Sequence, residues 1–268
     1  YMTLPDSVRE YQIPAADTTW SPGNFGGSTG QMYTLSQGLA RSMNTVTAAL
    51  VNEMGLSSAP RQIASYARRM GITTPLSAVP SIALGTSDVK LYDMVTAYST
   101  LASGGIRRDP VVVTRIEDRY GNVLWENRRQ ESEALSKRTA YTVVDMLRGV
   151  IDYGTGIRMR TQFQLQGYDL AGKTGTTQQA ADTWFMLMHP NLVTGSWVGF
   201  NDRRLTFRTD WWGQGSHSAL FLVGDFYRRV ANSDLKVLRP DASFQMVDLD
   251  PSDADSTDVS RPDGRVGW

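Results

Sequence analysis

The chain has 268 residues and a mass of 29.7 kDa, enough for one large domain or two modest ones. With 41% hydrophobic and 20% charged residues, its composition excludes a wholly disordered or fibrous protein. The 27 basic and 27 acidic residues balance, so the charge predicts no nucleic-acid partner. Cysteine is absent and only two histidines occur, which excludes disulfide frameworks and thiolate metal sites and disfavours a histidine-based metal site.

The chain begins at Tyr1, without a start Met, a charged leader or an apolar signal core. No run approaches the roughly 18 consecutive apolar residues that a membrane-spanning helix needs. We therefore expect the sequence to be a piece of a longer protein, in which a targeting segment could precede Tyr1.

Residues 1–33 are rich in Pro, Gly, Ser and Thr and show little apolar periodicity, which predicts an extended or looping lead-in. Thr34, with Gln37 three residues on, is typical of a capping box and predicts that a helical segment over 34–54 begins there. The polar triplet Ser42-Met43-Asn44 interrupts the apolar pattern and predicts a break or a tight turn inside that segment.

The middle of the chain predicts two helices, a hairpin and a third helix. Pro60 and Gly71 bracket a short helix, and a longer one follows over about 89–102. Gly121-Asn122, between β-branched and aromatic runs, is a hairpin signal. Ser136 then caps a helix that extends to Ile151.

After Leu170 the pattern becomes strand-like, with three strands expected over 168–177, 183–188 and 192–200 and a last helix over about 218–232. Helices first, then a mostly antiparallel sheet, then a closing helix predict an α+β fold rather than βαβ repeats. The tail from Asp241 to Trp268 has a net charge of −5 and is expected to be disordered or loosely packed.

The most informative segment surrounds Lys173. Residues 167–174 match G-x-x-x-x-G-K-T, the nucleotide-binding P-loop. A P-loop follows a buried apolar strand and opens a helix, whereas here the preceding residues are polar and Gly175-Thr176-Thr177 disfavours a helix. The context favours an edge strand lining a cleft, with Lys173 on one face and the hydroxyls of Thr174 and Thr176 on the other. A P-loop NTPase stays as an alternative.

Ser42-Met43-Asn44 and Lys173-Thr174-Gly175 occur in the order of two sequence marks of the penicillin-recognising serine enzymes, Ser-x-Asn and Lys-Thr-Gly. Further blocks lie around them: Leu35–Asn44, Leu84–Ser87, Leu147–Val150, Tyr153–Gly156, Ala171–Thr177 and Trp197–Asp202. In order and spacing these blocks resemble the transpeptidase domain of class A (bifunctional) penicillin-binding proteins. The resemblance covers about residues 18–232.

The resemblance implies the penicillin-binding transpeptidase fold, shared with serine β-lactamases, in which helices flank a mainly antiparallel sheet. It would occupy residues 34–240, between the lead-in 1–33 and the acidic tail 241–268. It implies a D,D-transpeptidase that cross-links peptidoglycan stem peptides ending in D-Ala-D-Ala and that β-lactams acylate. It implies no metal and no cofactor, and a location on the outer side of the membrane, where an N-terminal anchor would hold the parent protein.

By the same resemblance, Ser42 would help to pass a proton to the leaving amine, and Asn44 would hydrogen-bond the acyl side of the substrate. Lys173 would support this proton transfer electrostatically. The residues Thr174, Gly175 and Thr176 would form the substrate-binding strand, with Thr176 as our choice for the terminal carboxylate.

The third family mark, Ser-x-x-Lys, is absent before Ser42, since the first lysine is Lys90. Ser87-Asp88-Val89-Lys90 comes later, and Ser87 is expected to cap the next helix, so the nucleophile stays unassigned. Three explanations stay open. The sequence is a truncated, inactive fragment of a normal enzyme, or the chain is a non-catalytic module that binds peptidoglycan or β-lactams, or the nucleophile is Ser87.

Five further positions are considered for a function. Trp211-Trp212 could floor a glycan or peptide groove, although packing is the commoner role. Thr155 could shape the rim of the cleft, or simply end a helix. Neither His189 nor His217 is expected to be catalytic.

Overall fold

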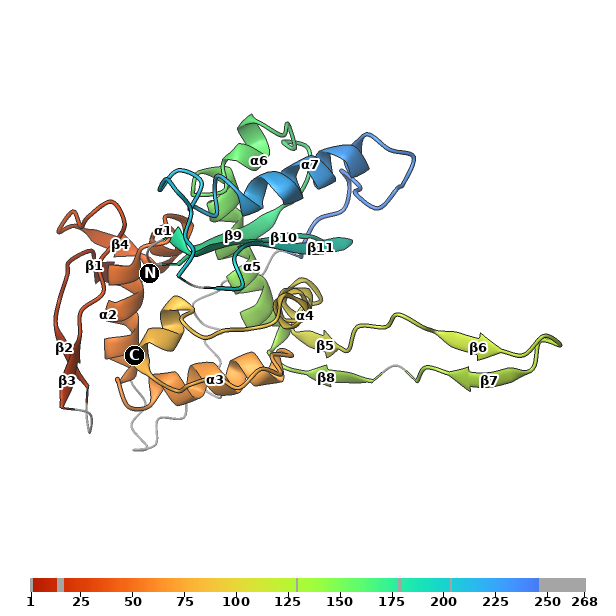
Figure 1. The fold of residues 1–268 in the computed structure, drawn as a ribbon, viewed down its shortest axis with the longest axis horizontal. Coiled ribbons are helices and arrows are strands. Elements are labelled where there is room, and N and C mark those ends of the chain that lie inside the picture. The colour runs from red at the N-terminus through yellow and green to blue at the C-terminus, as the bar shows by residue number, and fades with distance from the viewer. Residues whose placement is uncertain (1, 14–16, 129, 178–179, 203, 246–268) are drawn as a thin grey trace.

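The computed structural model describes residues 2–13, 17–128, 130–177, 180–202 and 204–245. Its central element is a three-stranded antiparallel sheet with the strand order β11-β10-β9. The strands are β9 (Ala171–Thr176), β10 (Asp182–His189) and β11 (Leu192–Gly199). Helices lie on both faces of this sheet (Figure 1), so the predicted α+β fold with an antiparallel sheet flanked by helices is confirmed.

Side chains that alternate along β10 build one core on each face of the sheet. Phe185 and Leu187 pack with α6 (Arg158–Thr161) and α7 (Ala219–Ala231). Met188 points to the opposite face and packs with α5 (Lys137–Asp152). Because a strand sends successive side chains to opposite faces, one apolar run supplies both cores.

The helical side contains α1 (Leu35–Ala40), α2 (Asn44–Met54), α3 (Ala59–Arg69), a 3₁₀ helix (Pro80–Leu84) and α4 (Leu91–Ala102). The predicted capping box is confirmed: the Thr34 hydroxyl accepts from the Gln37 amide, and the Gln37 side chain accepts from the Thr34 amide. The predicted break at Ser42 is also confirmed, since α1 ends just before it and α2 begins just after.

The lead-in is more structured than predicted. It contains β1 (Thr3–Pro5), β2 (Tyr11–Ile13), β3 (Thr18–Trp20) and β4 (Met32–Thr34), which pair as β1-β4 and β2-β3. Asp6, directly after β1, is fully buried and accepts hydrogen bonds from Asn24, Thr29 and Thr45. The lead-in is therefore attached to the start of α2 by a buried carboxylate.

A long arm made of two ribbons leaves the body between α4 and α5 (Figure 1). The ribbon nearer the body pairs β5 (Ile106–Arg108) with β8 (Glu131–Glu133). The outer ribbon pairs β6 (Arg115–Glu117) with β7 (Val123–Glu126), and the predicted hairpin at Gly121-Asn122 closes it.

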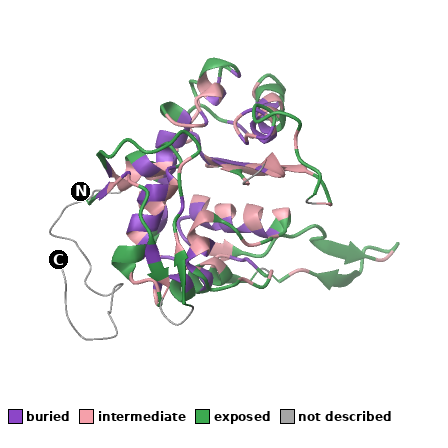
Figure 2. Ribbon diagram, turned by 60° about the vertical axis from the view of Figure 1, so that its left-hand side comes forward, coloured by how far each residue is buried: buried purple, intermediate pink, exposed green. Residues whose placement is uncertain are grey.

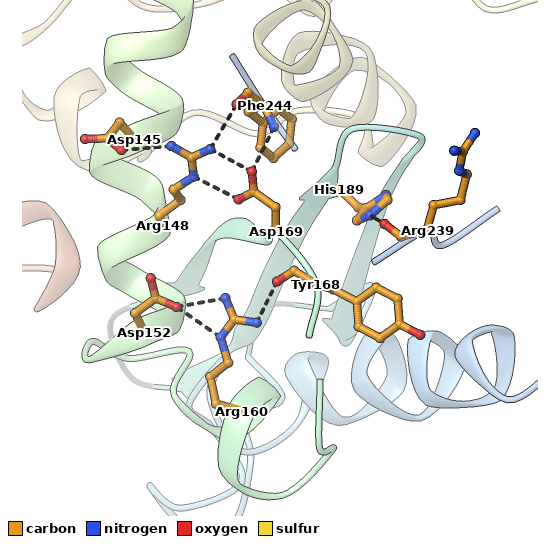
Figure 3. Close-up of polar contacts among 9 residues, drawn as sticks. All are labelled: Asp145, Arg148, Asp152, Arg160, Tyr168, Asp169, His189, Arg239 and Phe244. Atoms are coloured by element: carbon orange, nitrogen blue, oxygen red, sulfur yellow. Dashed lines mark hydrogen bonds and ion pairs between the residues drawn. The ribbon is translucent and has the colours of Figure 1, made fainter. Parts of the chain in front are cut away.

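The first residues of the predicted tail are packed rather than loose (Figure 3). Asp169, just before β9, accepts two hydrogen bonds from the Arg148 guanidinium of α5 and a third from the backbone amide of Phe244. The Phe244 ring is buried, and the Arg148 guanidinium lies 5.7 Å from its centre. The expectation of a loose tail is therefore wrong for Phe244, while Asp241, Ser243 and Gln245 are exposed and residues 246–268 lie outside the described residues.

Ser87 does not cap the following helix, contrary to the prediction. The N-cap residue of α4 is Lys90, whose own side chain makes no capping hydrogen bond. Nearer the C-terminus, α7 begins at Ala219, one residue after the expected start. The sequence pattern placed both helices correctly to within about two residues, which is the usual accuracy for helix ends.

Candidate active site

The side chains of Lys173 and Ser42 are in contact although the two residues are 131 positions apart in the sequence. The Lys173 ammonium donates one hydrogen bond to the Ser42 hydroxyl, with Nζ and Oγ 2.7 Å apart. It donates a second to the Thr174 carbonyl at 2.8 Å. Lys173 therefore joins strand β9, at an edge of the described sheet, to the turn between α1 and α2.

The backbone of this turn explains why Ser42 is presented to solvent. Ser42 has φ of +57°, a left-handed conformation that non-glycine residues rarely adopt. The Met43 amide closes the turn on the Gly38 carbonyl. A β-carbon on Gly38 would lie 2.6 Å from a methyl of Val46, so a glycine is needed for α1 and α2 to approach this closely. The turn leaves the Ser42 side chain exposed.

Burial lowers the pKa of Lys173 from 10.5 to about 8. The residue keeps some solvent contact, but protein atoms surround its ammonium on most sides. An amine with this pKa exchanges protons near neutral pH more readily than an ordinary lysine, which suits a group that assists proton transfer.

The lowered pKa makes stability depend on pH. The unfolded chain binds more protons than the folded chain between about pH 8 and pH 10.5, so the contribution of Lys173 to folding becomes more favourable as pH rises through that window. Urea unfolding of the wild type and Lys173→Met at about pH 7.5 and about pH 10 measures this effect. We expect the wild type to gain stability relative to the variant at the higher pH. If the difference in unfolding free energy between the wild type and the variant is the same at both pH values, the pKa of Lys173 is not lowered in the folded chain.

In the turn after α5, Thr155 contacts both the end of α1, just before Ser42, and strand β9, which carries Lys173. The Thr155 amide donates to the carbonyl of Ala40, the last residue of α1. Its hydroxyl lies 2.7 Å from the hydroxyl of Thr174. A β-carbon on Gly154 would lie 2.2 Å from the same Ala40 carbonyl, so this contact requires glycine. Thr155 thus supports both the Ser42 turn and β9, a role that its place in the sequence does not reveal.

Thr155→Val is expected to lower the free energy of unfolding by about 1–2 kcal/mol, because it leaves the buried Thr174 hydroxyl without its partner. Thr155→Ser keeps the hydroxyl and should stay within about 0.5 kcal/mol of the wild type. Urea unfolding measures both variants. Equal losses for valine and serine would mean that the hydroxyl pair contributes nothing.

Thr176, the exposed last residue of β9, is held by the segment that precedes α7. The Gly215 amide donates to the Thr176 Oγ1 at 3.0 Å, which leaves the hydroxyl hydrogen free for an outside acceptor. Near Gly215, the Trp211 ring stacks on the His217 ring, with the two ring centroids 3.7 Å apart. The Arg158 guanidinium lies 5.5 Å from the centre of the Trp211 ring. Trp211 thus packs within this segment, although about half of it is exposed, as is also true of Trp212.

Asn44, the first residue of α2, donates its side-chain amide to the Gly23 carbonyl at 2.9 Å. The amide that we expected to face a substrate is thus in contact with the lead-in. Asp6, which the sequence analysis did not single out, accepts a hydrogen bond from Thr45, the residue after Asn44. Burial opposes the ionisation of Asp6, but hydrogen bonds from Thr45, Thr29 and Asn24 outweigh it and lower its pKa.

Lys173 and Thr174 lie inside strand β9, and the next element among the described residues is strand β10. A P-loop places this Lys-Thr pair at the start of a helix, so the P-loop interpretation is wrong. Within the described ranges, no group of three or more His, Cys, Asp or Glu side chains is placed to hold a metal ion. In the same ranges, no helix has the length and apolar character needed to cross a bilayer.

Residues 7–201 match the family described as the penicillin binding protein transpeptidase domain. The chain belongs to this family. Penicillin-binding protein 2D of Bacillus subtilis is 35% identical to it over 197 residues, which are 72% of this chain and 28% of the relative. Penicillin-binding protein 1A of Aquifex aeolicus is 32% identical over 202 residues, 75% of this chain and 27% of the relative. This transpeptidase-family chain thus spans about a quarter of the length of these two relatives.

Solved structures of penicillin-binding proteins share the fold. Penicillin-binding protein 1A of Haemophilus influenzae superposes with a TM-score of 0.74 at 22% identity, over 87% of this chain and 39% of that one. Penicillin-binding protein A of M. tuberculosis, solved as an imipenem acyl-enzyme complex, gives 0.63 at 18% identity, over 84% and 54% of the two chains. The predicted transpeptidase fold is therefore confirmed.

Proposed function

We propose that this chain provides the substrate-binding strand and the proton-transfer groups of a peptidoglycan D,D-transpeptidase that acts outside the cytoplasmic membrane. Family membership supports the reaction class. The observation that carries the proposal is the 2.7 Å hydrogen bond from Lys173 to Ser42, because it joins two motifs that are far apart in sequence. The proposed substrates are stem peptides ending in D-Ala-D-Ala, and β-lactams would compete for the same site.

The chemistry is an acyl transfer. A serine hydroxyl attacks the penultimate carbonyl, an ester bond forms, the amide bond to the last D-alanine breaks, and the proton of the attacking hydroxyl leaves on the D-alanine amine. Ser42 accepts a hydrogen bond from Lys173, so its own hydrogen is free to be donated to that amine. Positive charge on Lys173 stabilises the serine oxygen while the proton moves. The attacking serine stays unassigned.

Substrate recognition falls to the end of β9. In the proposed arrangement the Thr176 hydroxyl, oriented by the Gly215 amide, donates to the terminal carboxylate of the peptide. Thr174 is buried and paired with Thr155, so it supports the strand rather than contacting the substrate. Gly175 lies between Thr174 and Thr176 in the strand. A β-carbon at this position would lie 2.9 Å from the β-carbon of Trp184.

A second candidate function is a module that binds the same peptides or β-lactams without turnover. It requires only a binding strand with a donor for the peptide carboxylate, such as the Thr176 hydroxyl that the Gly215 amide orients. Both candidates need the same binding strand. They differ in whether D-alanine is released.

Incubating a full-length protein that contains this chain with a fluorescent penicillin and, separately, with a peptide ending in D-Ala-D-Ala tests the proposal, because the attacking serine is not assigned within the chain itself. D-Alanine release, or a penicillin adduct that mass spectrometry maps to a serine other than Ser87, supports the transpeptidase. Saturable peptide binding without release supports the binding module instead. An adduct on Ser87 would overturn the assignment of Ser42 and Lys173, and absence of both binding and reaction would overturn both candidates.

A further inference from the structure

The arm presents an unpaired strand edge to solvent. All three residues of β6 and all four of β7 are exposed, and Figure 2 shows the arm projecting away from the buried parts of the body. Among the described residues, β6 and β7 pair only with each other. An isolated two-stranded ribbon with exposed apolar side chains is marginal in water, so a partner that extends the sheet would stabilise it.

The hydrogen bonds of the ribbon show which backbone groups face outward. The Thr114 carbonyl accepts from Asn127, and the Asp118 amide donates to the Asn122 carbonyl, so both residues point their backbone groups at β7. Orientation repeats every two residues along a strand, so Ile116 also points at β7. The amides and carbonyls of Arg115 and Glu117 therefore point away from β7, at the free edge.

The free edge of β6 is complementary to itself. If two copies of β6 lie antiparallel around a two-fold axis at Ile116, Arg115 of one copy lies opposite Glu117 of the other, and the reverse. These are also the residues whose outward amides and carbonyls would exchange hydrogen bonds. Arg115 and Glu117 already form an ion pair on one face of their own strand, so both charges are placed for cross-strand pairing.

The β7 edge lacks this complementarity. Its ladder carries a β-bulge, because Ile116 pairs with Trp125 while Glu117 pairs with Val123, and bulges disfavour further pairing. A two-fold axis at Trp125 would place Glu126 opposite Leu124. The β6 edge is the regular one with matched charges.

We propose that a second copy of this chain docks on the arm, with two β6 strands pairing around Ile116 to form a four-stranded sheet. Antiparallel pairing places the two bodies at opposite ends of that sheet, since each arm extends beyond its own body (Figure 1). The same pairing brings Ile116 and Trp125 of one copy next to Ile116 and Trp125 of the other, on one face of the four-stranded sheet. Both side chains are about half-exposed in the single chain. This inference is independent of the proposed function.

A cysteine at position 116 tests the two-fold axis, because the chain contains no other cysteine. Opposed residues in a non-hydrogen-bonded antiparallel pair have α-carbons about 4.5 Å apart, within the range that a disulfide spans. Ile116→Cys should therefore give a covalent dimer under mild oxidation, seen by non-reducing electrophoresis. Val123→Cys is the matched control, because Val123 on β7 is 49% exposed and Ile116 is 48% exposed.

Charge reversal tests the register by sedimentation equilibrium. Glu117→Arg places like charges opposite each other at two symmetry-related pairs and should weaken dimerisation roughly tenfold. Arg115→Glu combined with Glu117→Arg restores opposite charges and should return the association constant to within about threefold of the wild type. The double variant restores the ion pair within the strand as well as the pairs between copies, so the cross-linking at position 116 is what shows that the contact is intermolecular.

Three results would overturn the proposal: a wild-type chain that sediments as a monomer at every concentration, equal cross-linking from Ile116→Cys and Val123→Cys, or an association constant that Glu117→Arg leaves unchanged. Preferential cross-linking at 116, together with loss and recovery in the charge variants, supports it.

Discussion

In a full-length protein that contains this chain and supplies the attacking serine, Lys173→Met is expected to slow D-alanine release from a peptide ending in D-Ala-D-Ala by roughly 100- to 1,000-fold, the usual cost of removing one preorganised hydrogen-bond donor. The variant removes the hydrogen bonds to Ser42 and to the Thr174 carbonyl and leaves an uncharged side chain of similar length. Because the charge acts on the moving proton, kcat should fall much more than KM changes. Coupled detection of free D-alanine measures both constants.

Lys137→Met is the control for Lys173→Met, because Lys137 is an exposed lysine at the start of α5. It should leave kcat and KM at the wild-type values. A Lys173→Met protein that keeps the wild-type kcat, or that changes KM alone, would show that this ammonium takes no part in proton transfer.

The second large effect concerns stability. Arg148→Met should lower the free energy of unfolding by about 3 kcal/mol, because it leaves the largely buried Asp169 carboxylate without its cation. Asp169 also holds the backbone of Phe244, so the variant weakens a contact that joins α5, the start of β9 and the C-terminal segment (Figure 3). Urea unfolding followed by tryptophan fluorescence measures the loss.

Two variants separate this pair from an ordinary surface ion pair. Arg229→Met breaks an exposed pair with Asp225 on α7 and should cost no more than about 0.5 kcal/mol. Combining Arg148→Met with Asp169→Asn removes the unpaired charge, so the double variant should be less destabilised than the sum of the single changes. Additive losses would mean that the two side chains do not interact.

Much of the fold follows from local sequence signals. The capping box at Thr34, the interruption at Ser42 and the hairpin at Gly121-Asn122 are set by residues only a few positions apart, and all three are present in the structure. The apolar run around Phe185 predicted a strand for the same reason. Such features depend on backbone preferences that a short segment carries with it.

The contacts of the candidate site depend on distant residues and were harder to predict. The meeting of Ser42 and Lys173 came from family resemblance, because nothing in either motif specifies its partner. Thr155 was expected at the rim of the cleft, but its hydroxyl pair with Thr174 was not predicted, and neither was the Gly215 amide, since a glycine in a loop has many uses. Asp6 lies in a segment without periodicity, where burial of a carboxylate leaves no trace in the pattern.

The packing of Phe244 limits how far the chain can be truncated from its C-terminus without losing a core contact. A boundary after residue 240, which composition alone suggests, would remove a ring from the core and a backbone donor from Asp169. The packed unit therefore extends at least through Phe244. Tags and fusion partners belong beyond that residue, where they leave the closure of α5 against the sheet undisturbed.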